Sequence, residues 1–228
     1  MPDSTPAPAR KRRARGHLTP DRIVEVAMGI IERDGSEALT FRRLGTELGA
    51  DHTAVLRHFR NKDELMLALA DRLMAEALSG ITVSDDWRAT LTELAQRIRL
   101  ACRAHPHVAL AVSGRTGRRE SEFVGAEIVI GALLRAGLRG REAASCYRAL
   151  VEVALSYSAM EATLLTLPPE ALAGDREAWG REYLALPPDQ YPNIAAVAPH
   201  LAEVDKEDQF EIALGLFLDA IELRAQRV

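Results

Sequence analysis

The stretch from Thr40 to Leu65, TFRRLGTELGADHTAVLRHFRNKDEL, constrains the fold more than any other part of the chain. Thr40 can cap a helix, because its hydroxyl accepts an amide hydrogen that the first helical turn leaves unpaired. Apolar side chains follow at helical spacing, and Gly49 then ends the pattern. A second helix is expected to start near Asp51, since a carboxylate is favoured at the positive end of a helix dipole. Two short helices joined by a tight turn form a helix-turn-helix, which predicts DNA binding.

The second helix of this motif is expected to run from Asp51 to Phe59 and to have two unlike faces. Val55 and Phe59, four residues apart, are expected to face inward. The outer face is left to side chains that can reach base edges and phosphates in a major groove, namely His52, Thr53, Arg57 and His58. Asn61 can cap the next helix. Lys62 in its first turn conflicts with the helix dipole, unless a phosphate lies beside it.

A third helix is expected ahead of the motif. Thr19, Pro20 and Asp21 combine an N-cap, a proline at the first helical position and an acid in the first turn. The helix is expected to stop at Gly35. Its apolar residues form one continuous stripe, which would support the helix-turn-helix from behind. Three helices over residues 18–62 therefore make up the predicted DNA-binding domain.

Charge is distributed unevenly along the 228 residues, although the net charge is only −4. Residues 1–62 hold 12 of the 29 Lys and Arg and 8 of the 33 Asp and Glu, so the part with the motif is basic and the rest is acidic. Residues 1–17 are predicted to be a flexible basic arm that neutralises phosphates or enters the minor groove. The alternative is a disordered tail kept soluble by charge. The cations of this arm are Arg10, Lys11, Arg12, Arg13 and Arg15.

Composition excludes several classes of protein. The chain is 47% hydrophobic and 27% charged, and no apolar run approaches the ~20 residues of a membrane helix. The basic N-terminus is not followed by an apolar segment, so we expect no export and a cytoplasmic location. Two cysteines are too few for a disulfide framework. No GxSxG, HExxH, CxxC or glycine-rich phosphate loop occurs, so we expect neither an enzyme nor a cofactor.

The remaining residues, 63–228, are predicted to form a larger helical domain, which makes the fold class all-α. Proline and glycine are frequent from 168 to 199, so irregular chain or short helices are expected over residues 168–205. Apolar spacing predicts helices over residues 62–79, 87–104, 121–138, 141–167 and 206–225, with a short helix before Ser113 and a basic loop over 115–119.

Residues 18–74 resemble the N-terminal domain of the tetracycline-repressor (TetR) family of regulators. The stretch LTPDRIVEVAMGIIERDGSEALTFRRLGTELGADHTAVLRHFRNKDELMLALADRLM has the family order of a helix, a gap, and then G…LT…LG…H-F-x-N-K-x-x-L. The segment YPNIAAVAPHLAEVDKEDQFEIALGLFLDAIELR is similar, more loosely, to the final helices of the branch that includes the tetracycline repressor. The middle of the chain is not diagnostic.

The resemblance implies roles for individual residues and a homodimer. Thr40 and Arg42 would contact DNA from the second helix, Lys62 would contact phosphate, and the recognition face would consist of His52, Thr53, Arg57 and His58. Leu56 departs from the family, which commonly has a tyrosine there. Residues 141–167 and 206–225 would pair with their symmetry mates in a four-helix interface, although packing within one chain is the alternative.

The function that follows is a ligand-responsive transcriptional regulator, a repressor that binds a palindromic operator as a homodimer and is released by a small-molecule effector. The alternative is a constitutive or architectural DNA-binding dimer without an effector. The two differ in one structural expectation. A ligand-gated repressor needs a pocket of a few hundred Å³ between its helices, and the alternative predicts no cavity.

An effector pocket would be mainly apolar with a few polar groups. Each candidate also has a structural interpretation: the histidines beside Pro106 can bond a loop, and Tyr147, Tyr157 and Met160 can pack in the core. Glu152 and Glu161 can be buried counter-charges for a cationic drug or surface acids that face Arg148. The two cysteines can be buried or can sense redox state. The spacing of the two histidines offers no third ligand, so no metal site is predicted. The candidates are Arg99, Cys102, Arg103, His105, His107, Cys146, Tyr147, Glu152, Tyr157, Met160, Glu161 and Trp179.

Overall fold

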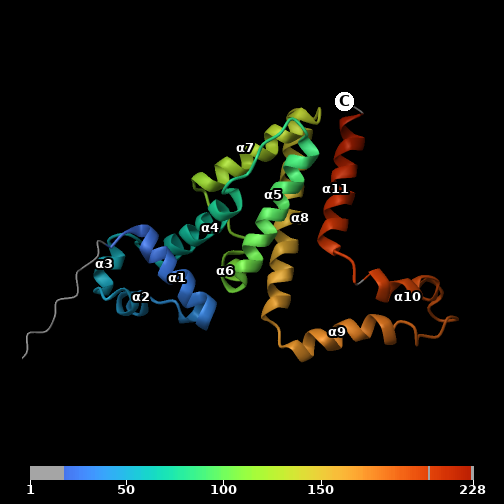
Figure 1. Ribbon diagram of the computed structural model, residues 1–228, viewed down its shortest axis with the longest axis horizontal. Coiled ribbons are helices and arrows are strands. Elements are labelled where there is room, and N and C mark those ends of the chain that lie inside the picture. The colour runs from blue at the N-terminus through green and yellow to red at the C-terminus, as the bar shows by residue number, and fades with distance from the viewer. Residues whose placement is uncertain (1–17, 205, 227–228) are drawn as a thin grey trace, which may run out of the picture.

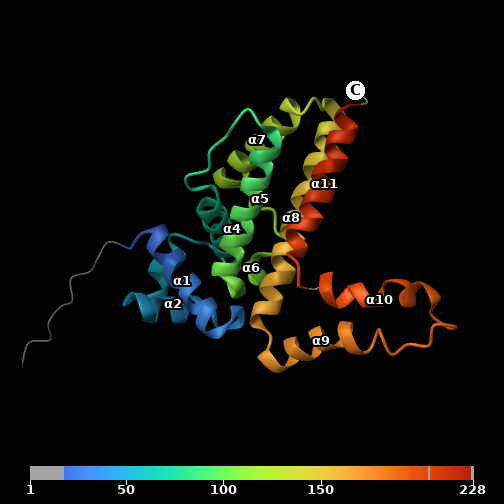
Figure 2. The same cartoon turned by 45° about the vertical axis from the view of Figure 1, so that its right-hand side comes forward.

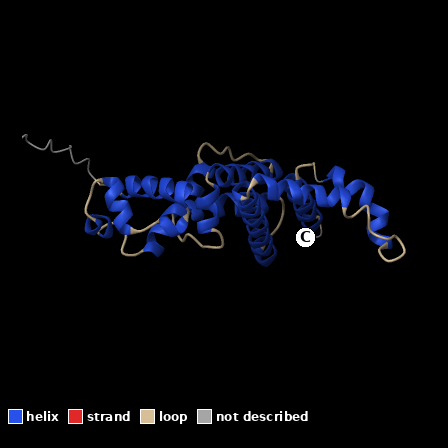
Figure 3. Ribbon diagram, turned by 90° about the horizontal axis from the view of Figure 1, so that it is seen from below, coloured by secondary structure: helices blue, strands red, loops and turns tan. Residues whose placement is uncertain are grey.

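The structure, a computed structural model, describes residues 18–204 and 206–226, and all regular elements in these ranges are helical (Figure 3). The predicted all-α fold is confirmed. In chain order the elements are α1 (Pro20–Asp34), the 3-10 turn η1 (Ser36–Ala38), α2 (Phe41–Leu48), α3 (His52–Leu56), α4 (Lys62–Leu78), α5 (Trp87–Ala104), α6 (Pro106–Val112), α7 (Glu120–Arg135), α8 (Gly140–Thr166), α9 (Pro169–Arg181), α10 (Pro192–Val204) and α11 (Gln209–Ala225).

Capping residues start the first helices where the sequence predicts them. The side chains of Thr19, Thr40 and Asn61 each accept a hydrogen bond from the amide three residues along, at 3.3, 3.2 and 2.8 Å. Gly49 ends α2 in the left-handed region, with φ of 64°, a conformation that costs glycine little. The boundaries of α1, α2 and α4 therefore follow from local chemistry.

The recognition helix is shorter than the predicted Asp51–Phe59. It spans His52–Leu56, with Asp51 outside it as the cap whose carboxylate accepts from the Thr53 amide at 2.8 Å. The Val55 carbonyl accepts from the amides three and four residues further on, at 2.9 and 3.1 Å. This sharing tightens the last turn, so the chain leaves the helix before the predicted end.

Residues 168–205, for which irregular chain or short helices are expected, consist mostly of two helices, since α9 and α10 each have 13 residues. Pro169 and Pro192 are the first residues of these helices, where a missing amide hydrogen costs nothing. Pro199 lies inside α10. The last helix starts later than the predicted residue 206, because the Asp208 carboxylate caps α11 by accepting from the amides of Phe210 and Glu211.

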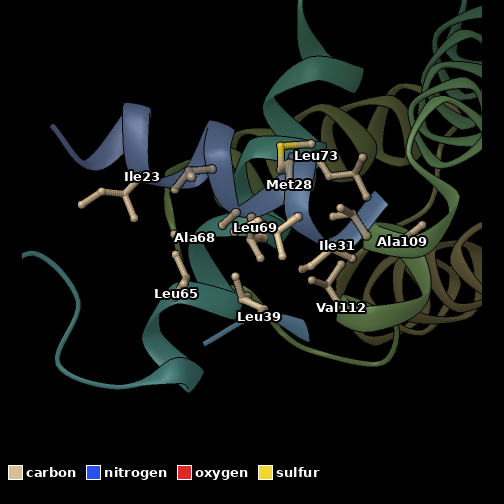
Figure 4. Packing of buried hydrophobic residues seen from close by; sticks show 14 of the residues in the cluster. Ile23, Met28, Ile31, Leu39, Leu65, Ala68, Leu69, Leu73, Ala109 and Val112 are labelled. Atoms are coloured by element: carbon tan, nitrogen blue, oxygen red, sulfur yellow. The ribbon is translucent and has the colours of Figure 1, made fainter. Parts of the chain in front are cut away.

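The buried apolar side chains form two clusters. The first joins α1, α2, α3 and α4 to α6, and Figure 4 shows Ala109 and Val112 of α6 beside Ile31 of α1. The second cluster joins α5, α7, α8 and α11. The short helix α6 is thus packed into the same core as the helix-turn-helix, although it follows α5 in the chain.

Helices α9 and α10 lie side by side and project away from the other helices (Figures 1 and 2). Among their described side chains only Ala198 is buried. Helix α11 then returns along α8, and its buried face contains Phe210, Leu214 and Leu218. We call residues 169–204 the projecting arm.

Candidate DNA-binding surface and ligand cavity

Helices α2 and α3 approach each other most closely at Gly45. A Cβ atom at this position would lie 2.9 Å from the Ala50 carbonyl oxygen and 3.0 Å from the His52 nitrogen. Both neighbours are backbone atoms, which cannot move aside as a flexible side chain can. Glycine at this position therefore sets the angle of the recognition helix against α2. Val55 and Phe59, buried as predicted, hold α3 on the core.

Two arginines on this domain are used internally. Glu47 of α2 accepts from Arg33 at 2.8 Å and from Arg43 at 3.3 Å, and Arg43 also contacts Asp34. The hydrogen bond from Arg33 lowers the pKa of Glu47. This network ties the end of α1 to α2, so these two guanidinium groups hold the helix-turn-helix together.

Three other arginines beside the recognition helix are exposed and form no ion pair with any residue that the structure describes. The second helix of a helix-turn-helix enters the major groove in such proteins, so free guanidinium groups at this surface have the reach that contacts with base edges and phosphates require. Arg60 is not named in the sequence analysis. Its position between the buried Phe59 and the helix cap Asn61 could have indicated an exposed cation at this surface. The three are Arg42, Arg57 and Arg60.

The predicted recognition face has polar groups with local partners. His52 and Thr53 are exposed and His58 is half-buried. The Thr53 hydroxyl donates to Asp51 at 2.7 Å, and this bond is the main cause of the lowered pKa of the Asp51 carboxyl. The Thr40 hydroxyl is likewise engaged as the cap of α2. Both threonine hydroxyls therefore already have a partner within the chain.

Lys62 has a partner within the chain. Its Nζ donates to the Ser36 carbonyl oxygen at 3.1 Å, which ties the start of α4 to η1. The hydrogen bond to the Ser36 carbonyl thus offsets the unfavourable position of the Lys62 cation in the first turn of α4. The predicted phosphate contact of this exposed lysine stays a prediction. The predicted basic arm, with Arg10, Lys11, Arg12, Arg13 and Arg15, lies outside the described residues.

A cavity of about 640 Å³ lies among α4, α5, α6, α7 and α8. Its walls carry large apolar side chains such as Leu73, Met74, Leu94 and Val129. The lining also contains small residues, whose side chains leave space between the facing helices. They are Ala70, Ala77, Ala95, Gly125, Ala126 and Ala154. A mainly apolar cavity of this size fits the usual range of small-molecule sites.

Three of the predicted effector residues line this cavity: Cys102, Tyr147 and Glu152. Burial raises the pKa of Cys102 to about 11, and burial also raises that of Cys146, which is outside the cavity lining. Protonated thiols are poor nucleophiles, so neither cysteine has the character of a redox sensor. Glu152 pairs with Arg148 at the exposed rim of the cavity.

Arg99 and Glu161 do not line the cavity. They form a half-buried ion pair, with Arg99 Nε and Nη2 at 2.6 and 2.5 Å from the two Glu161 oxygens. Arg99 Nη1 donates to Asp208 at 2.7 Å, and the guanidinium lies 4.7 Å from the centre of the Phe210 ring. The bonds to Glu161 raise the pKa of Arg99, and the bond from Arg99 lowers that of Asp208. This cluster ties α5, α8 and α11 together.

The other predicted effector residues also lie outside the lining of the cavity. His105 Nε2 lies 3.1 Å from a Glu76 oxygen of α4, and Tyr157 packs edge-on against Phe210. Arg103 lies 3.6 Å from Glu161, His107 is half-buried, and Met160 is exposed. Trp179 is in α9, and its side chain is outside the described part of the structure.

Sequence reasoning missed polar residues that do line the cavity. Asp71 comes from α4, Arg115 from the loop after α6, and Glu122 from α7. Asp71 accepts from the Ser121 amide at 3.1 Å, across a separation of 50 residues. Neither apolar spacing nor a local motif signals such a contact, because it depends on how α4 and α7 pack.

The described residues offer neither a metal site nor a membrane span. No three His, Cys, Asp or Glu side chains among them come together as a metal site would require. None of the described helices is both long and apolar enough to span a bilayer.

Family models match both parts of the chain. Residues 23–69 match the model described as bacterial regulatory proteins, tetR family, and residues 82–225 match the model described as tetracyclin repressor-like, C-terminal domain. The second match alone spans more than half of the chain. The chain belongs to the TetR family. The resemblance stated from residues 18–74 is thereby confirmed, and the protein is a transcriptional regulator and not an enzyme.

Individual TetR-family proteins are similar over nearly the whole length. The chain is 29% identical to tetracycline repressor protein class A from transposon 1721 of Escherichia coli, over 91% of this chain and 92% of the relative. It is also 29% identical to the transcriptional repressor DrrR1 of Streptomyces coeruleorubidus, over 92% and 80%. The crystal structure of Streptomyces coelicolor ActR in complex with actinorhodin matches with a TM-score of 0.79 at 25% identity, covering 92% of this chain and 99% of that chain.

Proposed function

We propose that this protein is a ligand-responsive repressor that binds a palindromic operator as a homodimer in the cytoplasm and is released by a small-molecule effector. Residues 18–62 read the DNA, and residues 63–228 bind the effector and dimerise. The cavity of about 640 Å³ carries this proposal, because a protein that only bound DNA would have no use for it. The similar ActR structure holds actinorhodin, which supports a ligand in a protein of this fold.

Contact with DNA rests on the free arginines of the helix-turn-helix. Arg57 follows α3 directly and can reach a guanine edge, for which a bidentate arginine is the commonest partner. Leu56, 39% exposed, offers an apolar contact suited to a thymine methyl group. Arg42 and Arg60 flank this face and suit phosphates. One five-residue helix reads few bases, so two copies are needed for a specific site.

A homodimer is supported by large apolar side chains that are exposed on α8 and α11. Helix α8 exposes Met160 and Leu164, one turn apart, and α11 exposes Ile212, Leu216 and Leu223 on the side opposite its buried face. Leu216 is 68% exposed. Contiguous exposed apolar surface of this kind typically marks a protein interface. Pairing α8 and α11 with their symmetry mates would bury both rows in a four-helix arrangement.

The projecting arm supports the same assembly. It exposes Leu184, Tyr191 and Val197, and it packs little against the other helices of its own chain. A second copy would cover these side chains. In the resulting dimer, the two recognition helices would enter successive major grooves about 34–36 Å apart.

The constitutive or architectural DNA-binding dimer is the competing function. This function would use the helix-turn-helix and the dimer, but it would not require the cavity. Effector release requires that a ligand bind two conformations of the dimer with different affinity, since equal binding would shift nothing. The test between the two functions must therefore include ligand and not DNA alone.

The first experiment is a selection of genomic fragments on the purified full chain at moderate salt, followed by footprinting of the recovered sites. The proposal expects a palindromic motif, protection of two half-sites about one helical turn apart, and two chains per duplex. Retention of fragments without a shared motif would overturn sequence-specific repression and favour the architectural function.

A further inference from the structure

The cavity has no free positive charge. Arg115 and Arg148 are the cationic side chains among its described lining residues. Arg115 lies 2.5 Å from an oxygen of Asp63, and Arg148 pairs with Glu152 on the neighbouring turn of α8. Both guanidinium groups are therefore neutralised at the rim. An anionic ligand would have to break one of these pairs to gain a counter-charge.

Two carboxylates stand at the side of the cavity formed by α4 and the start of α7. Asp71 Oδ1 accepts from the Ser121 amide at 3.1 Å, and Glu122 Oε2 accepts from the Arg118 amide at 2.8 Å. No cation in the described chain forms an ion pair with either group. A carboxylate has about four acceptor positions, so each retains capacity for a further donor.

Tyr147 of α8 belongs to the same polar side of the cavity. Burial, and then the negative charge of Glu122, raise the pKa of its phenol, so the hydroxyl stays protonated. Most of the remaining wall is apolar, with Leu91, Leu94 and Leu150 all buried, and its other charged groups are the paired Arg115, Arg148 and Glu152. The cavity thus combines a large apolar space with one side that accepts hydrogen bonds and is negatively charged.

We propose that the cavity selects a mainly apolar compound that carries no negative charge and whose hydroxyl or NH group donates to Asp71 or Glu122, and that it rejects anions of the same shape. This ligand class rests on the proposed function, because it concerns the same site. An anion would lose its hydration in the apolar space and meet two like charges, and both effects oppose binding. A neutral donor gains charge-assisted hydrogen bonds instead.

Two fluorescent probes with the same rings test this selectivity. N-phenyl-1-naphthylamine is uncharged and has one NH donor, and 8-anilinonaphthalene-1-sulfonate adds a sulfonate to the same skeleton. Titrated into the full chain, the neutral probe is expected to bind at least about tenfold more tightly than the sulfonate. Equal affinities, or tighter binding of the sulfonate, would overturn the proposal.

Substitution of the two carboxylates tests whether they cause the selectivity against the sulfonate. Asp71→Asn with Glu122→Gln removes both charges and keeps an oxygen that can accept from the same backbone amides. The sulfonate is expected to gain at least about fivefold in affinity, so the preference for the neutral probe narrows. The matched control, Asp85→Asn with Glu127→Gln, makes the same charge change at exposed positions outside the cavity. A similar gain in the control would overturn the assignment.

The location of the probe is tested by filling the cavity. Ala126→Leu adds bulk inside it, and Ala89→Leu makes the same change at an exposed position of α5. The neutral probe is expected to lose at least about tenfold in affinity for the first variant only. Unchanged binding to Ala126→Leu would place the probe elsewhere and overturn the proposal. Failure of cavity ligands to alter operator binding would instead count against the repressor function alone.

Discussion

The helix-turn-helix and the cavity are built in opposite ways. The proposed DNA-binding surface comes from consecutive residues, Thr40 to Lys62, whose caps, turn and free arginines are encoded next to one another. The cavity draws on five helices, with lining residues from Ala70 to Ala159. It exists because small side chains meet where large ones would fill the space. A surface that reads DNA can thus be recognised from a short segment, whereas a ligand site depends on how distant helices pack.

This difference predicts that each region can be damaged without the other. Substitutions in the motif should change operator affinity and leave probe binding intact. Substitutions among α4 to α8 should change probe binding or folding stability and leave the free protein's operator affinity nearly unchanged. The following variants test the separation, in order of decreasing effect.

The largest effect is expected from Gly45→Ala. The added Cβ would lie 2.9 Å from a backbone oxygen, so α3 must move relative to α2. Overpacking of this kind costs about 1–3 kcal/mol, and we expect roughly a hundredfold loss of operator affinity in gel-shift titrations. Gly29→Ala is the control, because its Cβ would have only an ordinary contact, at 3.6 Å from Arg33. Equal losses for the two variants would show that helix packing at Gly45 is not the cause.

Arg99→Gln should lower folding stability by about 2 kcal/mol, because the poorly exposed Glu161 carboxylate loses its charged hydrogen bonds. For a chain of this size the melting temperature should fall by about 4–8 °C, measured by circular dichroism. Neutral-probe affinity well below the melting transition should not change, since Arg99 is outside the cavity. A tenfold loss of probe binding at that temperature would mean that the cluster shapes the cavity after all.

Arg57→Ala should weaken operator binding about tenfold, which corresponds to about 1.4 kcal/mol, and should barely affect binding to random DNA. Lys62→Ala should weaken both if the lysine contacts phosphate, and should lower the salt slope by about 1. The two variants therefore separate base reading from backbone contact. Equal loss on operator and random DNA for Arg57→Ala would reject base reading by this residue.

The smallest effect is expected from Asp208→Asn. The hydrogen bond from Arg99 lowers the pKa of Asp208 from its ordinary value of 3.8, so ionisation stabilises the folded state above that pH. The contribution disappears as the pH falls through the lowered value. Because the carboxylate is 45% exposed, we expect a loss below about 1 kcal/mol at pH 7. Denaturant titrations at pH 7 and pH 2.5 should show that the difference from the unchanged chain becomes smaller in acid, and a constant difference would contradict this cause.

Much of the fold could be predicted because helix starts are local. Thr19, Thr40 and Asn61 cap the helices that they were expected to cap, and glycines end two of them. The end of α3 could not be predicted, since it depends on two amides sharing the Val55 carbonyl. For a related reason, the prolines of the projecting arm left irregular chain and short helices both open. A proline breaks a helix in its interior but starts one at its first position, and the sequence does not say which applies.

The cavity was predicted as a class of site but not residue by residue. Arg99 looked like an effector contact, yet Asp208, 109 positions away, and Glu161 hold it in a structural cluster. Asp71 was overlooked because only the packing of α4 against α7 brings it to the cavity. Pairing of charges between distant helices decides which polar side chains remain available to a ligand, and that information is tertiary.

The most direct test of the account is operator affinity measured with the cavity empty and with the cavity filled. Compounds that displace N-phenyl-1-naphthylamine would be titrated into the operator complex of the unchanged chain and of Ala126→Leu. At least one compound should lower operator affinity tenfold or more in the unchanged chain and have little effect on the filled variant, a coupling of about 1.4 kcal/mol. Compounds that occupy the cavity and leave operator affinity unchanged would contradict a ligand-gated repressor.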